Sequence, residues 1–105
     1  MKIKKGLEEE YRNYVELNAN NGYSKAITDA TEVLGNALDE GKTCEEAEDI
    51  ACKDAGLTGF MAGCMARAIA YYHPRGKEFK KYWNAQFGVK KAKGVVNPAI
   101  LTIGR

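Results

Sequence analysis

The stretch from Leu57 to Tyr72 constrains the fold of this chain more than any other feature, because it is apolar or small on every side of a helical wheel. Its sixteen residues, LTGFMAGCMARAIAYY, include a single charge, Arg67. An α-helix that is apolar all round has to be covered by neighbouring segments. It is also shorter than the roughly twenty apolar residues that a membrane span needs. The stretch therefore predicts the central helix of a small helical protein, with no membrane partner.

Four further segments have apolar residues at helical spacing and lie on both sides of the central stretch. They are Leu7 to Val15, Ala26 to Leu38, Ala47 to Ala51 and Phe79 to Phe87. Turn signals separate the segments: an Asn-rich cluster at 18–22, a glycine at 41, and a His-Pro-Arg-Gly turn at 73–76. We predict an all-α fold, a small bundle of four to five short helices around a central helix at about 57–73.

Polar residues indicate where these helices begin. Ser24 is predicted to cap the second helix and Thr58 the central one, and the spacing of Thr43 and Glu46 is that of a capping box at the third. The central stretch also has Gly59 and Gly63 four residues apart. This spacing predicts close packing between soluble helices, not a membrane dimer motif.

The two ends of the chain differ from the helical part. Residues 89–105 combine a basic linker with an apolar segment in which Asn97-Pro98 and several β-branched residues argue against a helix. We expect a helical domain at 1–88 and an extended C-terminal arm at 89–105. The N-terminus begins basic but turns acidic before an apolar segment can form, which is unlike a secretory signal. We therefore expect a cytoplasmic protein.

Charge divides the chain at the central stretch. Residues 1–56 carry seven Lys and Arg against thirteen Asp and Glu, whereas residues 57–105 carry nine Lys and Arg against Glu78 alone. The net charges are −6 and +8, although that of the whole chain is only +2. Such asymmetry suggests a polyanion or a membrane surface as partner of the basic end. The alternative is that the two halves neutralise each other, within the fold or across a dimer.

Candidate catalytic and metal-binding residues are few. Cys44, Cys52 and Cys64 have no CxxC spacing, so they indicate small apolar side chains in a reducing compartment, not a disulfide framework or a zinc site. A nucleophile–base pair of Cys64 and His73 would lie about 13 Å apart along one helix. The carboxylates of the third segment lack the spacing of a calcium loop. We expect a non-enzymatic protein with no catalytic residue, metal or cofactor.

Three motifs in the second half of the chain resemble a group of small proteins from phages and prophages of Gram-positive bacteria. They are Gly59-Phe60-Met61 with Gly63-Cys64, then Lys81-Tyr82-Trp83-Asn84, and then Gly94-Val95-Val96-Asn97-Pro98-Ala99-Ile100-Leu101. No activity or catalytic residue is established for that group. The resemblance therefore implies a setting, the bacterial cytoplasm during phage or prophage expression, and little chemistry.

The candidate binding segment runs from Arg75 to Lys93, where seven positive charges are interleaved with aromatic residues. Basic side chains neutralise phosphates and release counterions, while aromatic faces stack on unpaired bases. The aromatic residues also have the spacing of a core-facing helix surface, so we expect Phe79 and Trp83 to be buried and Tyr82 to lie at the surface. The candidate nucleic-acid-binding residues are Arg75, Lys77, Lys80, Lys81, Tyr82, Lys90, Lys91 and Lys93.

A protein-interaction module is the alternative function. The apolar arm from Val95 to Ile103 could lie across the helices of its own subunit or across those of a partner, giving an exchanged dimer. By analogy with the phage setting, such a module would be a regulator or inhibitor of a host protein, or an assembly factor. The sequence leaves the choice between nucleic acid, a host protein and a homodimer open.

Overall fold

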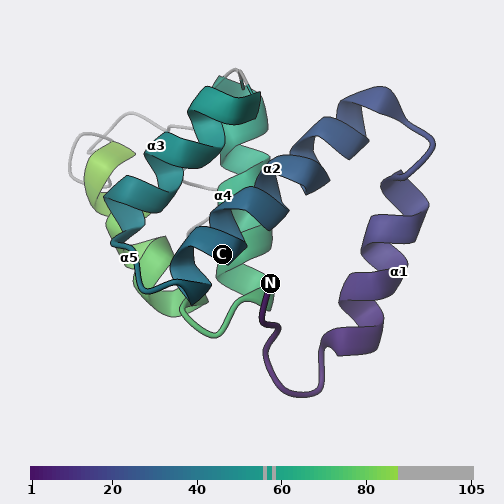
Figure 1. Cartoon of the computed structure of the whole chain (residues 1–105), viewed down its shortest axis with the longest axis horizontal. Coiled ribbons are helices and arrows are strands. Elements are labelled where there is room, and N and C mark those ends of the chain that lie inside the picture. Colours follow the sequence, from purple (N-terminus) through teal and green to yellow (C-terminus); the bar gives the residue numbers. More distant parts are fainter. Residues whose placement is uncertain (56, 58, 88–105) are drawn as a thin grey trace, which may run out of the picture.

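The computed structural model describes residues 1–55, 57 and 59–87, and in this part of the chain it contains five α-helices and no strand (Figure 1). The helices are α1 (Glu8–Asn18), α2 (Gly22–Asp39), α3 (Cys44–Ala55), α4 (Gly59–Tyr72) and α5 (Gly76–Phe87). The predicted all-α fold with a central apolar helix is confirmed. The predicted arm at 89–105 lies outside the described residues, as does Thr58.

The main core lies between α4 and the helices α2, α3 and α5. Met65 and Ile69 of α4 are fully buried and belong to one apolar cluster with Leu34 of α2. From α5, Phe79 and Trp83 join this cluster with 0% and 1% of their surfaces exposed, as predicted. Burying side chains of this kind contributes roughly 1.5–3 kcal/mol each relative to leaving them in water. The core therefore fixes one face of α5 against the bundle.

Helix α4 is not covered on every side, contrary to the expectation from its composition. Phe60, near its first turn, is 71% exposed, and Tyr71, in its last turn, is 50% exposed. Gly59 is exposed as well, and a Cβ placed there would meet nothing within 4 Å. The prediction of close packing is thus wrong for Gly59, while Gly63 is buried. None of the described helices is long and apolar enough to cross a membrane.

Helix α1 lies at the edge of the bundle (Figure 1). It packs through a second, smaller apolar cluster. Its buried residue Tyr11 meets Tyr72 of α4 edge-to-face, with ring centroids 5.0 Å apart, and its hydroxyl donates to Glu32 of α2. The segment before α1 runs along the end of α4, where the Lys4 backbone N–H donates to the Tyr72 carbonyl over 2.7 Å. Aromatic contacts and polar ties therefore hold α1 in place.

The helix ends follow most of the predicted signals. Thr43 and Glu46 form the predicted capping box, in which each side chain accepts from the other residue's backbone N–H. At the start of α2, however, the Asn21 side chain accepts from the Ser24 N–H, so the cap is Asn21 and the Ser24 prediction is wrong by three residues. Asparagine is among the best N-caps, and it begins the helix one turn earlier.

The turn between α4 and α5 is tight and forms as predicted. The Gly76 N–H donates to the His73 carbonyl over 2.8 Å, which closes the turn. Since α5 begins at Gly76, the turn places the first residues of α5 directly beside the last turn of α4. This contact sets the direction in which α5 leaves the core.

Candidate nucleic-acid interface

Helix α5 carries three lysines outside the stripe of its buried aromatic residues, with Lys77 almost opposite to Phe79 and Lys80 about 60° from Trp83. Lys77 and Lys81 are exposed and Lys80 is partly buried. At 100° per residue, the three lysines fall within about 100° of the helix circumference, and Lys77 is about 160° away from Phe79. Among the described residues, no carboxylate lies within 4.0 Å of their ammonium groups. We call Lys77, Lys80 and Lys81 the lysine face.

Arg75 is not part of this face, because its guanidinium is turned into the protein. Nη1 donates to the Leu38 carbonyl at 3.1 Å and to the Lys42 carbonyl at 2.7 Å. Nε and Nη2 donate to the two carboxylate oxygens of Glu78, at 2.9 and 2.7 Å. Four of the five N–H groups of a guanidinium are therefore engaged. Arg75 ties the end of α2 to the start of α5, which gives it a structural role.

The ion pair with Arg75 also compensates the negative charge of Glu78, the acidic residue of α5. Hydrogen bonds from Arg75 hold the pKa of the Glu78 carboxyl below its ordinary value, so this group stays ionised and paired at neutral pH. The bidentate form of the contact is the strong form of an Arg–carboxylate pair. With Glu78 paired, the three lysines are the uncompensated charges of α5.

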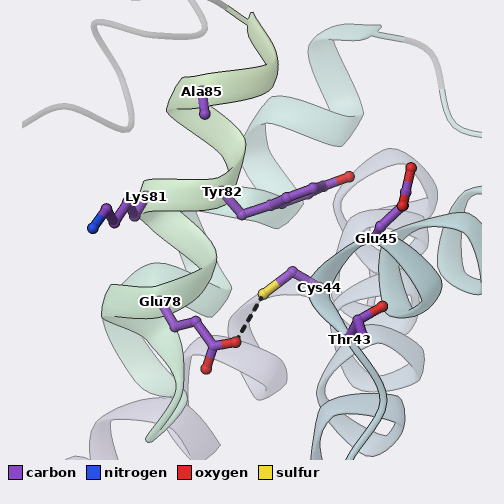
Figure 2. Close-up of a pocket in the computed structure, with 7 residues that line it drawn as sticks. All are labelled: Thr43, Cys44, Glu45, Glu78, Lys81, Tyr82 and Ala85. Atoms are coloured by element: carbon purple, nitrogen blue, oxygen red, sulfur yellow. Dashed lines mark hydrogen bonds between the residues drawn. The ribbon is translucent and has the colours of Figure 1, made fainter.

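Tyr82 lies on another side of α5 and faces α3 (Figure 2). Its hydroxyl donates to Glu48 over 2.5 Å, and burial together with this hydrogen bond raises the pKa of the Tyr82 phenol. The ring lines an open groove of about 470 Å³ together with Glu45, Glu78 and Lys81, and the Lys81 side chain points away from the ring. Half-buried and beside carboxylates, Tyr82 is poorly placed to meet a phosphate.

Cys44, at the base of the groove, is buried and its thiol donates to Glu78 over 3.6 Å (Figure 2). Burial, with the nearby Glu78 charge adding to it, raises the pKa of the Cys44 thiol to about 11. The thiolate is the nucleophilic form of cysteine, so this thiol is a weak nucleophile at neutral pH. All three cysteines are free.

His73 is 1% exposed and both of its ring nitrogens have partners. The Arg75 backbone N–H donates to Nδ1 over 2.9 Å, so Nδ1 is the acceptor and Nε2 carries the proton that is donated to Asp39 over 2.7 Å. The other carboxylate oxygen of Asp39 accepts from the Lys2 backbone N–H. Because both ring nitrogens are engaged, His73 has no free lone pair with which to take a proton from a cysteine. Its hydrogen bonds give it a structural role.

The sequence indicated part of this arrangement. Arg75 and Glu78 have the i,i+3 spacing of a helical ion pair, a signal that could have separated Arg75 from the lysines. The contact of His73 with Asp39 joins residues 34 positions apart, and no local pattern indicates it. Lys90, Lys91 and Lys93 lie outside the described residues, so the structure places only Lys77, Lys80 and Lys81 together. In the described part of the chain, no group of three or more His, Cys, Asp or Glu could hold a metal ion.

Comparison with known proteins gave no relative: no family model, curated protein or solved structure matches the sequence.

Proposed function

We propose that the protein is a non-enzymatic nucleic-acid-binding protein that uses the lysine face of α5 to neutralise phosphates. The observation that carries the proposal is that these three lysines lie together on one rigid helix with no carboxylate partner among the described residues. Lysine side chains gain affinity for a polyanion by releasing its condensed counterions. The sequence adds Lys90, Lys91 and Lys93 shortly after α5, which would extend the same positive charge.

The distribution of ion pairs supports this proposal over neutralisation within the fold. In the described residues, every pair of a Lys or Arg with an Asp or Glu lies within one half of the chain, as do Lys25–Asp29 and Arg75–Glu78. No such pair joins the acidic half to the basic half, so direct ion pairs do not cancel the charge of α5. The resemblance to phage and prophage proteins supports a setting in the bacterial cytoplasm.

A gel-shift titration tests the proposal. Lys77→Glu with Lys81→Glu should weaken binding to a nucleic-acid probe roughly tenfold or more at about 50 mM salt, because two phosphate contacts become repulsive. Lys5→Glu with Arg12→Glu is the matched control, since it changes the net charge equally at two exposed basic residues outside α5. The proposal would be contradicted by an equal loss of affinity in both double variants, or by a failure of the unaltered protein to bind the probe at low salt. Circular dichroism checks that each variant is folded.

A protein-interaction module is the second candidate, and one observation favours it. Leu17 and Tyr23, at the corner between α1 and α2, are 82% and 51% exposed. Apolar side chains grouped at a surface are typical of protein contacts. The C-terminal arm proposed for such contacts lies outside the described residues. Sedimentation velocity separates the candidates: a self-associated species that is lost on Leu17→Ser would favour the interaction module.

A further inference from the structure

The position of the aromatic residues of α5 indicates which form of nucleic acid the lysine face fits. We infer that the ligand is double-stranded and is held by its phosphate backbone, not by its bases. This inference rests on the proposed function and adds the class of ligand to it. The argument uses three observations: where the aromatic rings of α5 lie, where the other exposed rings lie, and how the lysines are spaced.

Proteins that bind single strands stack successive bases on exposed aromatic rings. The rings nearest to the lysine face are not available for this. Phe79 and Trp83 are fully buried, with their ring centroids 6.3 Å apart in a stacked arrangement, and Phe79 also meets Tyr82 at 5.6 Å. The Tyr82 hydroxyl is held by Glu48, and its ring lines the groove together with Glu45, Glu78 and Lys81. Three of the aromatic residues that suggested base stacking in the sequence, Phe79, Tyr82 and Trp83, therefore build the core and its edge.

The exposed rings elsewhere are poorly placed to serve the lysine face. Tyr71 lies beside Glu10, whose carboxylate raises the pKa of the Tyr71 phenol, and a phosphate would be repelled there. Tyr23 begins α2 at the end opposite to the one that Arg75 contacts. Phe60 lies at the end of α4 that is about 18 Å from the α4–α5 turn, whereas the lysine face begins directly after this turn. Since Phe60 is also the most exposed of these rings, the test of the inference includes a variant of it.

The lysine spacing suits a regular backbone. Lys77 and Lys81 are one helical turn apart, about 6 Å along the axis of α5. One strand of a duplex presents a phosphate about every 3.4 Å along the axis, so lysines this close together can contact neighbouring phosphates of one strand. A duplex also carries more charge per unit length than a single strand, and releases more counterions for each lysine that contacts it. Because α5 is fixed by its buried face and by Arg75, the backbone positions of the three lysines are fixed relative to one another and to the bundle.

Fluorescence anisotropy with one labelled 20-mer, presented as a single strand or as the duplex, tests the inference with the full chain. We expect the duplex to bind roughly tenfold more tightly at about 50 mM salt, with a log–log salt slope of about −2.7 or steeper, because each of the three lysines of the face contributes about −0.9. Phe60→Ala should leave both affinities unchanged. The fluorescence of Trp83 should not be quenched on binding, because its ring is already buried.

The outcomes separate the two proposals. Tighter duplex binding that is lost with Lys77→Glu and Lys81→Glu and kept with Phe60→Ala supports both. Equal or tighter binding of the single strand, or a loss of affinity on Phe60→Ala, overturns the duplex inference and leaves the proposed function standing. Binding of neither probe at low salt removes the proposed function and the inference with it.

Discussion

Gly76 begins α5 directly beside the last turn of α4. A Cβ built on it would lie 2.4 Å from the Ala70 carbonyl oxygen and 2.6 Å from that of Ile69, which is closer than any real contact. Both oxygens are backbone atoms of a helix and cannot move aside as a flexible side chain would. The absence of a side chain at this position is therefore what allows the two helices to approach each other in the turn.

Gly76→Ala should lower the free energy of unfolding by about 2–3 kcal/mol, because overpacking at a backbone contact forces the helices apart. Gly59→Ala is the matched control on α4: its Cβ meets nothing within 4 Å, so the variant should be stabilised by ~0.5 kcal/mol through the loss of unfolded-chain entropy. Urea denaturation measures both. Equal stabilities for the two variants would contradict this account of the turn.

At the scale of elements, Arg75 joins α2 to α5. The last carbonyls of a helix have no partner within it. The Leu38 carbonyl at the end of α2 and the Lys42 carbonyl just after it accept from Nη1 of Arg75, while Glu78 of α5 holds the rest of the guanidinium. His73, in the same turn, is bonded to Asp39 at the end of α2. Two side chains from one turn thus fix the position of α5 relative to α2.

Arg75→Lys should lower the free energy of unfolding by about 2 kcal/mol, because an ammonium group has three donors and no planar fork, and so cannot replace the four hydrogen bonds of the guanidinium. The net charge is unchanged, so the variant separates the structural contacts of Arg75 from its charge. Lys77→Arg is the control, since Lys77 is exposed and has no partner among the described residues. Thermal unfolding measures both variants. An Arg75→Lys protein as stable as the control would show that the bridge is dispensable.

Periodicity and turn residues were sufficient to predict the helices, but not which side of α4 is covered. The apolar spacing of Phe79 and Trp83 predicted their burial correctly, because a helix in a small core buries a single stripe. The same composition argument fails for Phe60 and Gly59, since coverage of a helix end depends on where the neighbouring helices stop. Similarly, charge alone groups Arg75 with the lysines: the spacing to Glu78 indicates one partner, but nothing local in the sequence indicates the Leu38 and Lys42 carbonyls that also bind it.

At the scale of the whole molecule, the fold raises the pKa of several tyrosine phenols and of the Cys44 thiol, and so keeps these groups protonated. Burial raises the pKa of the Tyr72 phenol to about 12 and that of the Cys44 thiol to about 11, and it raises those of Tyr11 and Tyr82 still further, with carboxylates nearby in each case. The ordinary values are 10.0 for tyrosine and 9.0 for cysteine. The folded protein therefore keeps protons that the unfolded chain would release in alkali.

This difference predicts a loss of stability at high pH. The stabilisation is fully present below about pH 9, where both states are protonated, and it falls as the pH rises toward the folded values, by about 1.4 kcal/mol per pH unit for each group that is ionised only in the unfolded chain. Thermal unfolding between pH 8 and 11 should show this fall, and Tyr82→Phe should reduce it by removing one phenol while keeping the ring. Tyr23→Phe, at an exposed tyrosine, is the control and should follow the unaltered protein. A melting temperature that stays constant to pH 11, or an equally steep fall in Tyr82→Phe, would show that Tyr82 is not held neutral against Glu48 by the fold.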